Sequence, residues 1–108
     1  MNRKPITRQY ALSVAQKLRR RLVRGHVPVQ QIFVFGSAIK GRSHAWSDID
    51  IAVICDPFLP SHFDELHQCN RTARTIDLRA EVVCLRPEDF RNMYSTLAQE
   101  IKQYGIAA

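Results

Sequence analysis

The chain has 108 residues, of which 45% are hydrophobic and 24% charged, a composition typical of one globular domain with a modest core. No apolar stretch approaches the roughly 20 residues of a membrane span, and the basic N-terminus lacks the apolar region of a signal peptide, so we expect neither. The net charge of +6 is concentrated in the first 47 residues, which contain no Asp or Glu. This asymmetry leaves a polyanionic partner open, but no interleaved aromatic residues mark a base-stacking surface.

Residues 7–24 have the pattern of an amphipathic helix, with basic residues in the C-terminal half and Gly25 as its terminator. Its apolar stripe comprises Tyr10, Ala11, Val14, Leu18 and Leu22. Residues 32–35 (Ile-Phe-Val-Phe) then have the length and composition of a buried strand that ends at Gly36. We expect the helix to be scaffold and the strand to lead into a functional turn.

The turn after this strand has the features of a phosphate site. Ser37 is placed to cap a short helix through the backbone N–H of Ile39 or Lys40. A helix N-terminus offers free N–H groups and the positive end of the helix dipole, which favour a phosphate.

Residues 47–53 (Ser-Asp-Ile-Asp-Ile-Ala-Val) predict a second strand that carries two acids. A period of two places Asp48 and Asp50 on one face, about 7 Å apart. Because Mg²⁺ is usually held by one or two carboxylates together with substrate phosphates, this pair predicts a metal site.

The second half of the chain predicts two more helices and a third strand. A helix over 61–74 follows a Pro-containing break, a strand covers 76–85, a helical turn begins at Pro87, and a last helix runs from Ser95 to Gly105 before a short edge strand. The residues expected inward are Phe63, Leu66, Cys69, Asn70, Ala73, Leu78, Ala80, Val82, Leu97, Ile101 and Tyr104. Three widely spaced cysteines without zinc-type pairing indicate buried, reduced thiols of a cytoplasmic protein.

The predicted order is α-β-α-β-α-β-α, in one α/β domain spanning residues 1–108. Gly36 ends its strand whereas Asp48 and Asp50 begin theirs, so these two strands must run antiparallel to meet at one place. A third carboxylate near the start of the third strand makes that strand parallel to the second. The sequence therefore predicts a mixed sheet flanked by helices.

The stretch FGSAIKGRSHAWSDIDIAV resembles the nucleotidyltransferase motif of the DNA polymerase β superfamily, in its small single-domain form, the minimal nucleotidyltransferases. Lys40, in Ile-Lys-Gly, stands where the family usually has the Arg of Ala-Arg-Gly, and it keeps the positive charge but loses the bidentate fork. The positions that match the motif outright are Gly36, Ser37, Ser47, Asp48 and Asp50. The resemblance implies that Asp48 and Asp50 are catalytic and bind metal, and that the nucleotide phosphates are held by Gly36, Ser37, Lys40 and Ser47.

The family also uses a third Asp or Glu on a neighbouring strand, which helps to hold the catalytic metal and can act as a base. Glu81 and Asp77 both qualify, since both fall on one face of the predicted third strand. We favour Glu81, whose spacing from the Pro-Glu-Asp-Phe turn follows the family pattern. Asp77 remains the alternative because its Ile-Asp-Leu-Arg context also resembles a family site.

The resemblance further implies ATP as the nucleotide substrate, two Mg²⁺ ions and transfer of AMP to a hydroxyl. Because the chain has no acceptor-binding domain, the acceptor implied is a separately encoded helical partner of the HEPN type, as in a toxin–antitoxin pair. The alternatives are transfer to RNA or to a small molecule such as an aminoglycoside, and a catalytically silent antitoxin that acts by binding alone. Binding of nucleic acid is open but not favoured.

Overall fold

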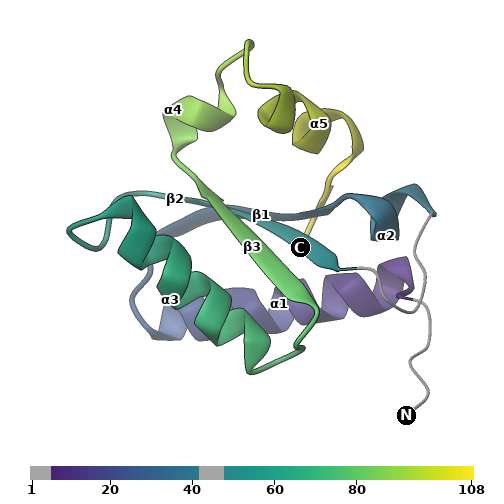
Figure 1. The fold of residues 1–108 in the computed structure, drawn as a ribbon, viewed down its shortest axis with the longest axis horizontal. Coiled ribbons are helices and arrows are strands. Elements are labelled where there is room, and N and C mark those ends of the chain that lie inside the picture. The colour runs from purple at the N-terminus through teal and green to yellow at the C-terminus, as the bar shows by residue number, and fades with distance from the viewer. Residues whose placement is uncertain (1–5, 42–47) are drawn as a thin grey trace.

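The computed structural model describes residues 6–41 and 48–108, which form a four-stranded sheet with helices on both faces (Figure 1). The elements in chain order are α1 (Arg8–Arg24), β1 (Val29–Phe35), α2 (Ser37–Lys40), β2 (Ile49–Cys55), α3 (His62–Arg74), β3 (Ala80–Leu85), α4 (Pro87–Phe90), α5 (Thr96–Tyr104) and β4 (Ile106–Ala107). The predicted alternation of helices and strands is confirmed.

The strand order in the sheet is β3-β2-β1-β4. β1 runs antiparallel to both β2 and β4, whereas β2 and β3 are parallel. The predicted mixed sheet and both predicted strand directions are therefore confirmed. As a result, the end of β1 and the starts of β2 and β3 lie at the same end of the sheet.

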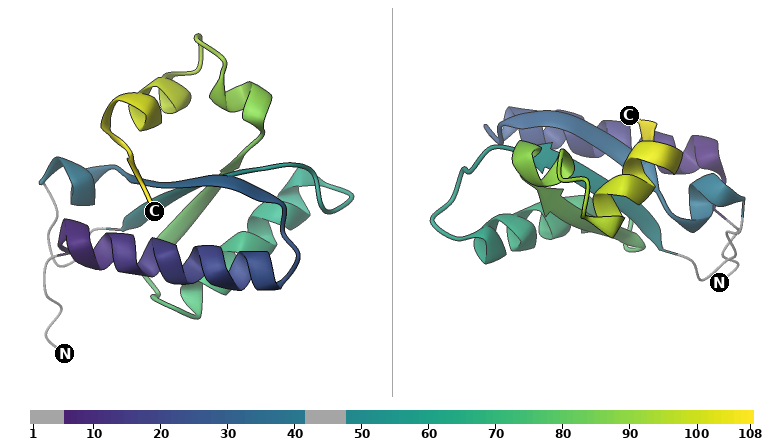
Figure 2. Two further views of the ribbon diagram at one scale, coloured as in Figure 1. Left: turned by 180° about the vertical axis from the view of Figure 1, so that it is seen from behind. Right: turned by 90° about the horizontal axis from the view of Figure 1, so that it is seen from above.

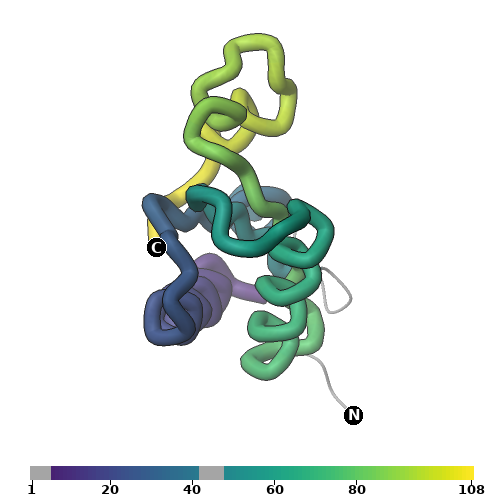
Figure 3. Tube along the Cα trace, turned by 90° about the vertical axis from the view of Figure 1, so that its left-hand side faces the viewer, coloured from purple at the N-terminus to yellow at the C-terminus, as the bar shows by residue number. Residues whose placement is uncertain are grey.

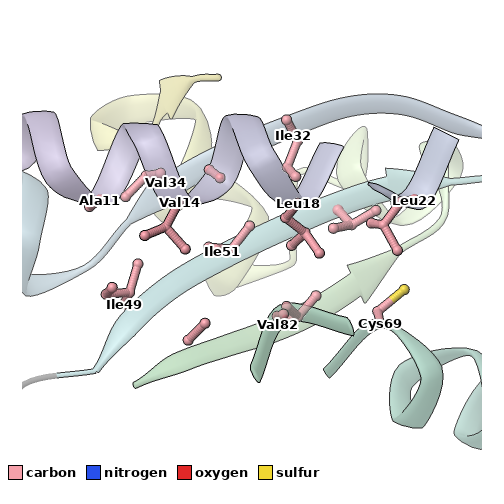
Figure 4. Close-up of a cluster of buried hydrophobic side chains, with 14 of the residues drawn as sticks. Ala11, Val14, Leu18, Leu22, Ile32, Val34, Ile49, Ile51, Cys69 and Val82 are labelled. Carbon is pink, nitrogen blue, oxygen red and sulfur yellow. The ribbon is translucent and has the colours of Figure 1, made fainter. Parts of the chain in front are cut away.

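Helices α1 and α3 cover one face of the sheet, and α4 and α5 cover the other (Figures 2 and 3). The larger core lies between the sheet and the first pair, where Leu18 and Leu22 of α1 meet Ile32 and Ile51 of the strands (Figure 4). Burial of each such side chain contributes about 1.5–3 kcal/mol. The second core is smaller and contains Phe35, Ala52 and Ile101.

The first helix begins one residue later than the pattern suggested, because Thr7 is its N-cap and accepts a hydrogen bond from the backbone N–H of Tyr10. Its apolar stripe is buried as predicted, except for Tyr10, which is 41% exposed. The Tyr10 hydroxyl instead donates a 2.6 Å hydrogen bond to Asp77.

The inward face of α3 differs from the prediction. Phe63 is 75% exposed, and the fully buried stripe is Glu65, Cys69 and Ala73. Glu65 is tolerated there because its carboxylate accepts the backbone N–H groups of Phe58 and Leu59 and pairs with Arg86.

Asn70 lies on the inner side of α3, as predicted, where its polar amide is satisfied by hydrogen bonds to the backbone of β3. It donates to the carbonyl of Val82 at 3.0 Å and accepts from the Val82 N–H at 2.9 Å. Since β3 is an edge strand, Asn70 occupies backbone groups that would otherwise be open to another strand.

The predicted third strand is four residues too long at its start. Ile76 and Asp77 continue the end of α3, both donating to the carbonyl of Ala73, and β3 begins only at Ala80. Leu78 lies in this turn and is 77% exposed, not inward as predicted. Tyr104, also expected inward, is 47% exposed at the end of α5.

The three cysteines are buried and unpaired, as predicted. Within the described ranges, no helix combines the length and apolar character needed to cross a membrane.

Candidate active site

Asp50 and Glu81 are brought together by the parallel pairing of β2 and β3, in which they are register partners. On the other side of β2, Asp50 is opposite Phe35, the last residue of β1. The residue that follows, Gly36, therefore lies beside the Asp50 carboxylate. The structure thus places three of the predicted site residues together at the end of the sheet where β1 ends.

Gly36 has a backbone conformation that favours glycine, with φ of 77° and ψ of −153°. A Cβ atom at this position would lie 2.3 Å from Oδ2 of Asp50. The absence of a side chain therefore allows the backbone to approach the carboxylate, and Gly36 is required twice over, for its conformation and for this contact.

The predicted cap of the short helix is wrong in detail. Gly36, not Ser37, is the N-cap of α2, and Gly36 makes no side-chain cap hydrogen bond. The carbonyl of Gly36 accepts the N–H of Ile39 at 3.2 Å and of Lys40 at 3.1 Å, so Ser37 is the first helical residue. The N–H groups of Ile39 and Lys40, one of which was expected to bond the Ser37 side chain, both donate to this backbone carbonyl instead.

The electrostatics at Asp50 are dominated by burial and by negative charge. Burial raises its pKa to about 6, helped by the charges of Glu81, Asp48 and Glu100. Asp48 is exposed and lies one residue before β2, not within the strand as predicted. Glu81 is also exposed.

Glu100 is a site neighbour that the sequence did not indicate, because it comes from α5, 50 residues along the chain from Asp50. Its Oε1 atom lies 2.6 Å from Nζ of Lys40. The same ammonium lies 4.9 Å from the ring centroid of Tyr104, on the next turn of α5. Lys40, four residues after Gly36, is thus held by two side chains of α5.

Asp77, the alternative third carboxylate, is engaged elsewhere. Its carboxylate accepts the backbone N–H of Arg79 at 2.8 Å, forms an ion pair with the Arg79 guanidinium at 3.0 Å, and accepts the Tyr10 hydroxyl. Although burial opposes it, these bonds lower the pKa of Asp77 to about 2. Asp77 therefore stabilises the turn before β3.

A groove of about 340 Å³ runs between α3 and β3 and includes Glu81 in its wall. The exposed ring of Phe63 and the side chains of His67 and Arg74 lie along the α3 side. Glu81 thus borders both Asp50 and an open groove.

The carboxylates match the oxygen donors that Mg²⁺ prefers, and a cation would relieve the repulsion that raises the pKa of Asp50. In the part of the chain that the structure describes, however, no three His, Cys, Asp or Glu side chains converge as a metal-binding group. Ser47, a predicted phosphate contact, lies outside the described residues.

Comparison with solved structures shows related folds. A toxin–antitoxin structure solved with AMP-PNP aligns at 26% identity and a TM-score of 0.60, covering 85% of this chain and 70% of that one. A structure from Sulfolobus solfataricus aligns at 16% identity and a TM-score of 0.63, covering 93% and 80%. The MntA–HepT toxin–antitoxin aligns at 21% identity and a TM-score of 0.57, covering 89% and 69%. The last two likenesses concern the fold alone.

No curated protein matches the chain. The family described as "Polymerase beta, Nucleotidyltransferase" does match, over residues 16–106, a range that contains β1, the Gly36 turn, β2 and β3. Since this match covers most of the chain, the protein belongs to the polymerase β nucleotidyltransferase family.

Proposed function

We propose that this protein is a Mg²⁺-dependent adenylyltransferase that transfers AMP from ATP to a hydroxyl of a protein partner, with pyrophosphate as the leaving group. The observation that carries the proposal is the register pairing of Asp50 with Glu81, beside the Gly36 turn and inside the family match. Carboxylates on adjacent strands next to an open backbone turn suit the binding of a metal and a triphosphate.

The proposed roles follow from position. Asp48, Asp50 and Glu81 would hold two Mg²⁺ ions, which, when bound, supply positive charge to the triphosphate and to the attacking oxygen. Gly36, Ser37, Lys40 and Ser47 would bind the phosphates. Glu81 would also accept the proton of the acceptor hydroxyl, because it is exposed and borders the groove along β3.

The proposed partner is a helical protein of the HEPN type, in a toxin–antitoxin pair. The likeness to a toxin–antitoxin structure solved with AMP-PNP supports both the pairing and an adenine nucleotide. The likeness in fold to the MntA–HepT toxin–antitoxin is consistent with such a pair. Buried free thiols suit a reducing compartment, and we place the pair in the cytoplasm.

Thermal unfolding with Mg·ATP, compared with ATP and EDTA, tests nucleotide and metal binding. A ligand at 100 times its dissociation constant adds about 2.7 kcal/mol, which raises the Tm of a domain this size by about 10 °C. The Asp48→Asn/Asp50→Asn double variant should lose this shift. If ATP raised the Tm equally in EDTA, nucleotide binding would not depend on Mg²⁺. If millimolar Mg·ATP did not raise the Tm, the result would argue against an active site.

Transfer itself is tested with ATP labelled at the α- or the γ-phosphate, in the presence of the partner. Label from the α-phosphate on the partner, and none from the γ-phosphate, is the expected result. Binding of the partner without label would instead support an antitoxin that acts by binding alone.

A further inference from the structure

Lys40 is contacted by two side chains of α5 that lie one helical turn apart. Glu100 accepts a 2.6 Å charged hydrogen bond from the ammonium, and the ring of Tyr104 lies 4.9 Å from it. Lysine has a long flexible stem, and two fixed contacts remove much of its freedom. The last helix therefore determines where the ammonium of Lys40 lies.

That place is next to the candidate active site. The backbone N–H of Lys40 donates to the carbonyl of Gly36 at 3.1 Å, so the residue is one turn from the proposed phosphate site. The charge of Glu100 is one of those that act on Asp50. The ion pair thus lies between α5 and the site, and its side chains are only about one-third exposed, 30% for Lys40 and 36% for Glu100.

We propose that Glu100 is a positioning residue for nucleotide binding, which together with Tyr104 holds the Lys40 ammonium ready to contact the triphosphate. The inference rests on the proposed function, since it needs a nucleotide at the Gly36 turn. It assigns to α5 a part in nucleotide affinity, although α5 follows the acidic motif by some 50 residues.

Two physical effects of Glu100 on nucleotide binding have opposite signs, which makes the inference testable. As a bare negative charge, Glu100 repels the triphosphate, so its removal should tighten binding. Because Glu100 also orders the Lys40 side chain, less conformational entropy is lost when the nucleotide binds, so removal of Glu100 should weaken binding. The second effect is the one proposed to dominate.

The experiment measures the Kd of a fluorescent ATP analogue with Mg²⁺ for the full chain, together with KM and kcat for transfer. Glu100→Gln should weaken binding about fivefold and Lys40→Ala about tenfold, while the double variant should bind no more weakly than Lys40→Ala. The transfer rate at saturating nucleotide should change less than twofold for Glu100→Gln. Lys40→Arg should recover most of the affinity, because arginine also pairs with carboxylates and stacks on rings.

Glu88→Gln on α4 is the matched control, since it removes an exposed acid from outside the site and should leave the Kd unchanged. Unchanged or tighter binding by Glu100→Gln would overturn the inference while leaving the proposed function intact. Additive losses in the double variant would also overturn it, because Glu100 would then act independently of Lys40. If the wild-type protein showed no Mg²⁺-dependent binding, the proposed function would fail first and the inference with it.

Discussion

Asp50 is the acid of the candidate site whose ionisation is most strongly opposed by its surroundings. Burial and the surrounding acids raise its pKa from 3.8 to about 6. Because the folded-state pKa lies above the unfolded value, ionisation of Asp50 favours unfolding. The stability linked to its protonated form is complete below about pH 4 and is lost as the pH rises through 6.

Asp50→Asn should therefore stabilise the metal-free protein at pH 7.5. We expect the free energy of unfolding to rise by about 1 kcal/mol, less than a two-unit shift alone implies because the carboxyl is partly exposed to solvent. The gain should shrink as the pH falls towards 4, where Asp50 is protonated in the folded state. Urea titrations at both pH values measure it, with Glu88→Gln as a control. A loss of stability at pH 7.5 would show that the carboxylate makes a structural contact.

At the scale of single elements, the start of β3 separates the two candidates for the third carboxylate. Glu81 is the second residue of the strand and the register partner of Asp50, whereas Asp77 precedes the strand and is bonded to Arg79 and Tyr10. Spacing in the sequence left both residues as candidates for the third carboxylate, and only Glu81 lies within β3.

We expect Glu81→Gln to slow single-turnover AMP transfer at least about 100-fold, roughly 3 kcal/mol of barrier, without lowering the free energy of unfolding. Asp77→Asn should slow it less than tenfold but lower the free energy of unfolding by about 1 kcal/mol, because it loses an ion pair and weakens two hydrogen bonds. Rapid-quench assays and urea titrations of the same preparations give both quantities. The opposite ranking of rates would move the catalytic role to Asp77.

Elements with strong periodicity could be predicted from the sequence, and elements that depend on distant partners could not. The first helix and the two strands that flank the Gly36 turn have clear apolar patterns, and strand directions followed from requiring the acids to meet. On α3, Cys69 and Ala73 are buried as predicted, but Glu65 was missed because its burial depends on hydrogen bonds from the preceding loop and on Arg86. The third strand was predicted to start four residues too early, because Asp77 makes a turn whose polar and apolar residues alternate as they would in a strand. Glu100 could not be found, since nothing local places α5 beside Asp50.

At the scale of the whole molecule, an ion pair links the helical layers on the two faces of the sheet. It lies at the end of the sheet opposite the candidate active site. Glu65 belongs to α3 on one face, and Arg86 is the N-cap of α4 on the other. Their side chains form a buried ion pair, and Arg86 also donates to the carbonyl of Cys55 at the end of β2. Burial alone would raise the pKa of Glu65, but the N–H of Phe58 and the guanidinium of Arg86 hold it below its usual value.

Glu65→Ala should therefore be the most destabilising of the changes considered, at about 3–5 kcal/mol, because it leaves the Arg86 charge largely buried without its carboxylate. That is a large share of the 5–15 kcal/mol typical of a domain. Glu65→Gln keeps an oxygen to accept the Phe58 N–H and should cost less. Glu100→Ala, which breaks a partly exposed ion pair, should cost about 1 kcal/mol or less. Urea unfolding of the three variants at pH 7.5 gives the ranking. A loss below 1 kcal/mol for Glu65→Ala would mean that Arg86 finds solvent or another acceptor, and that the two layers are held together by their separate cores alone.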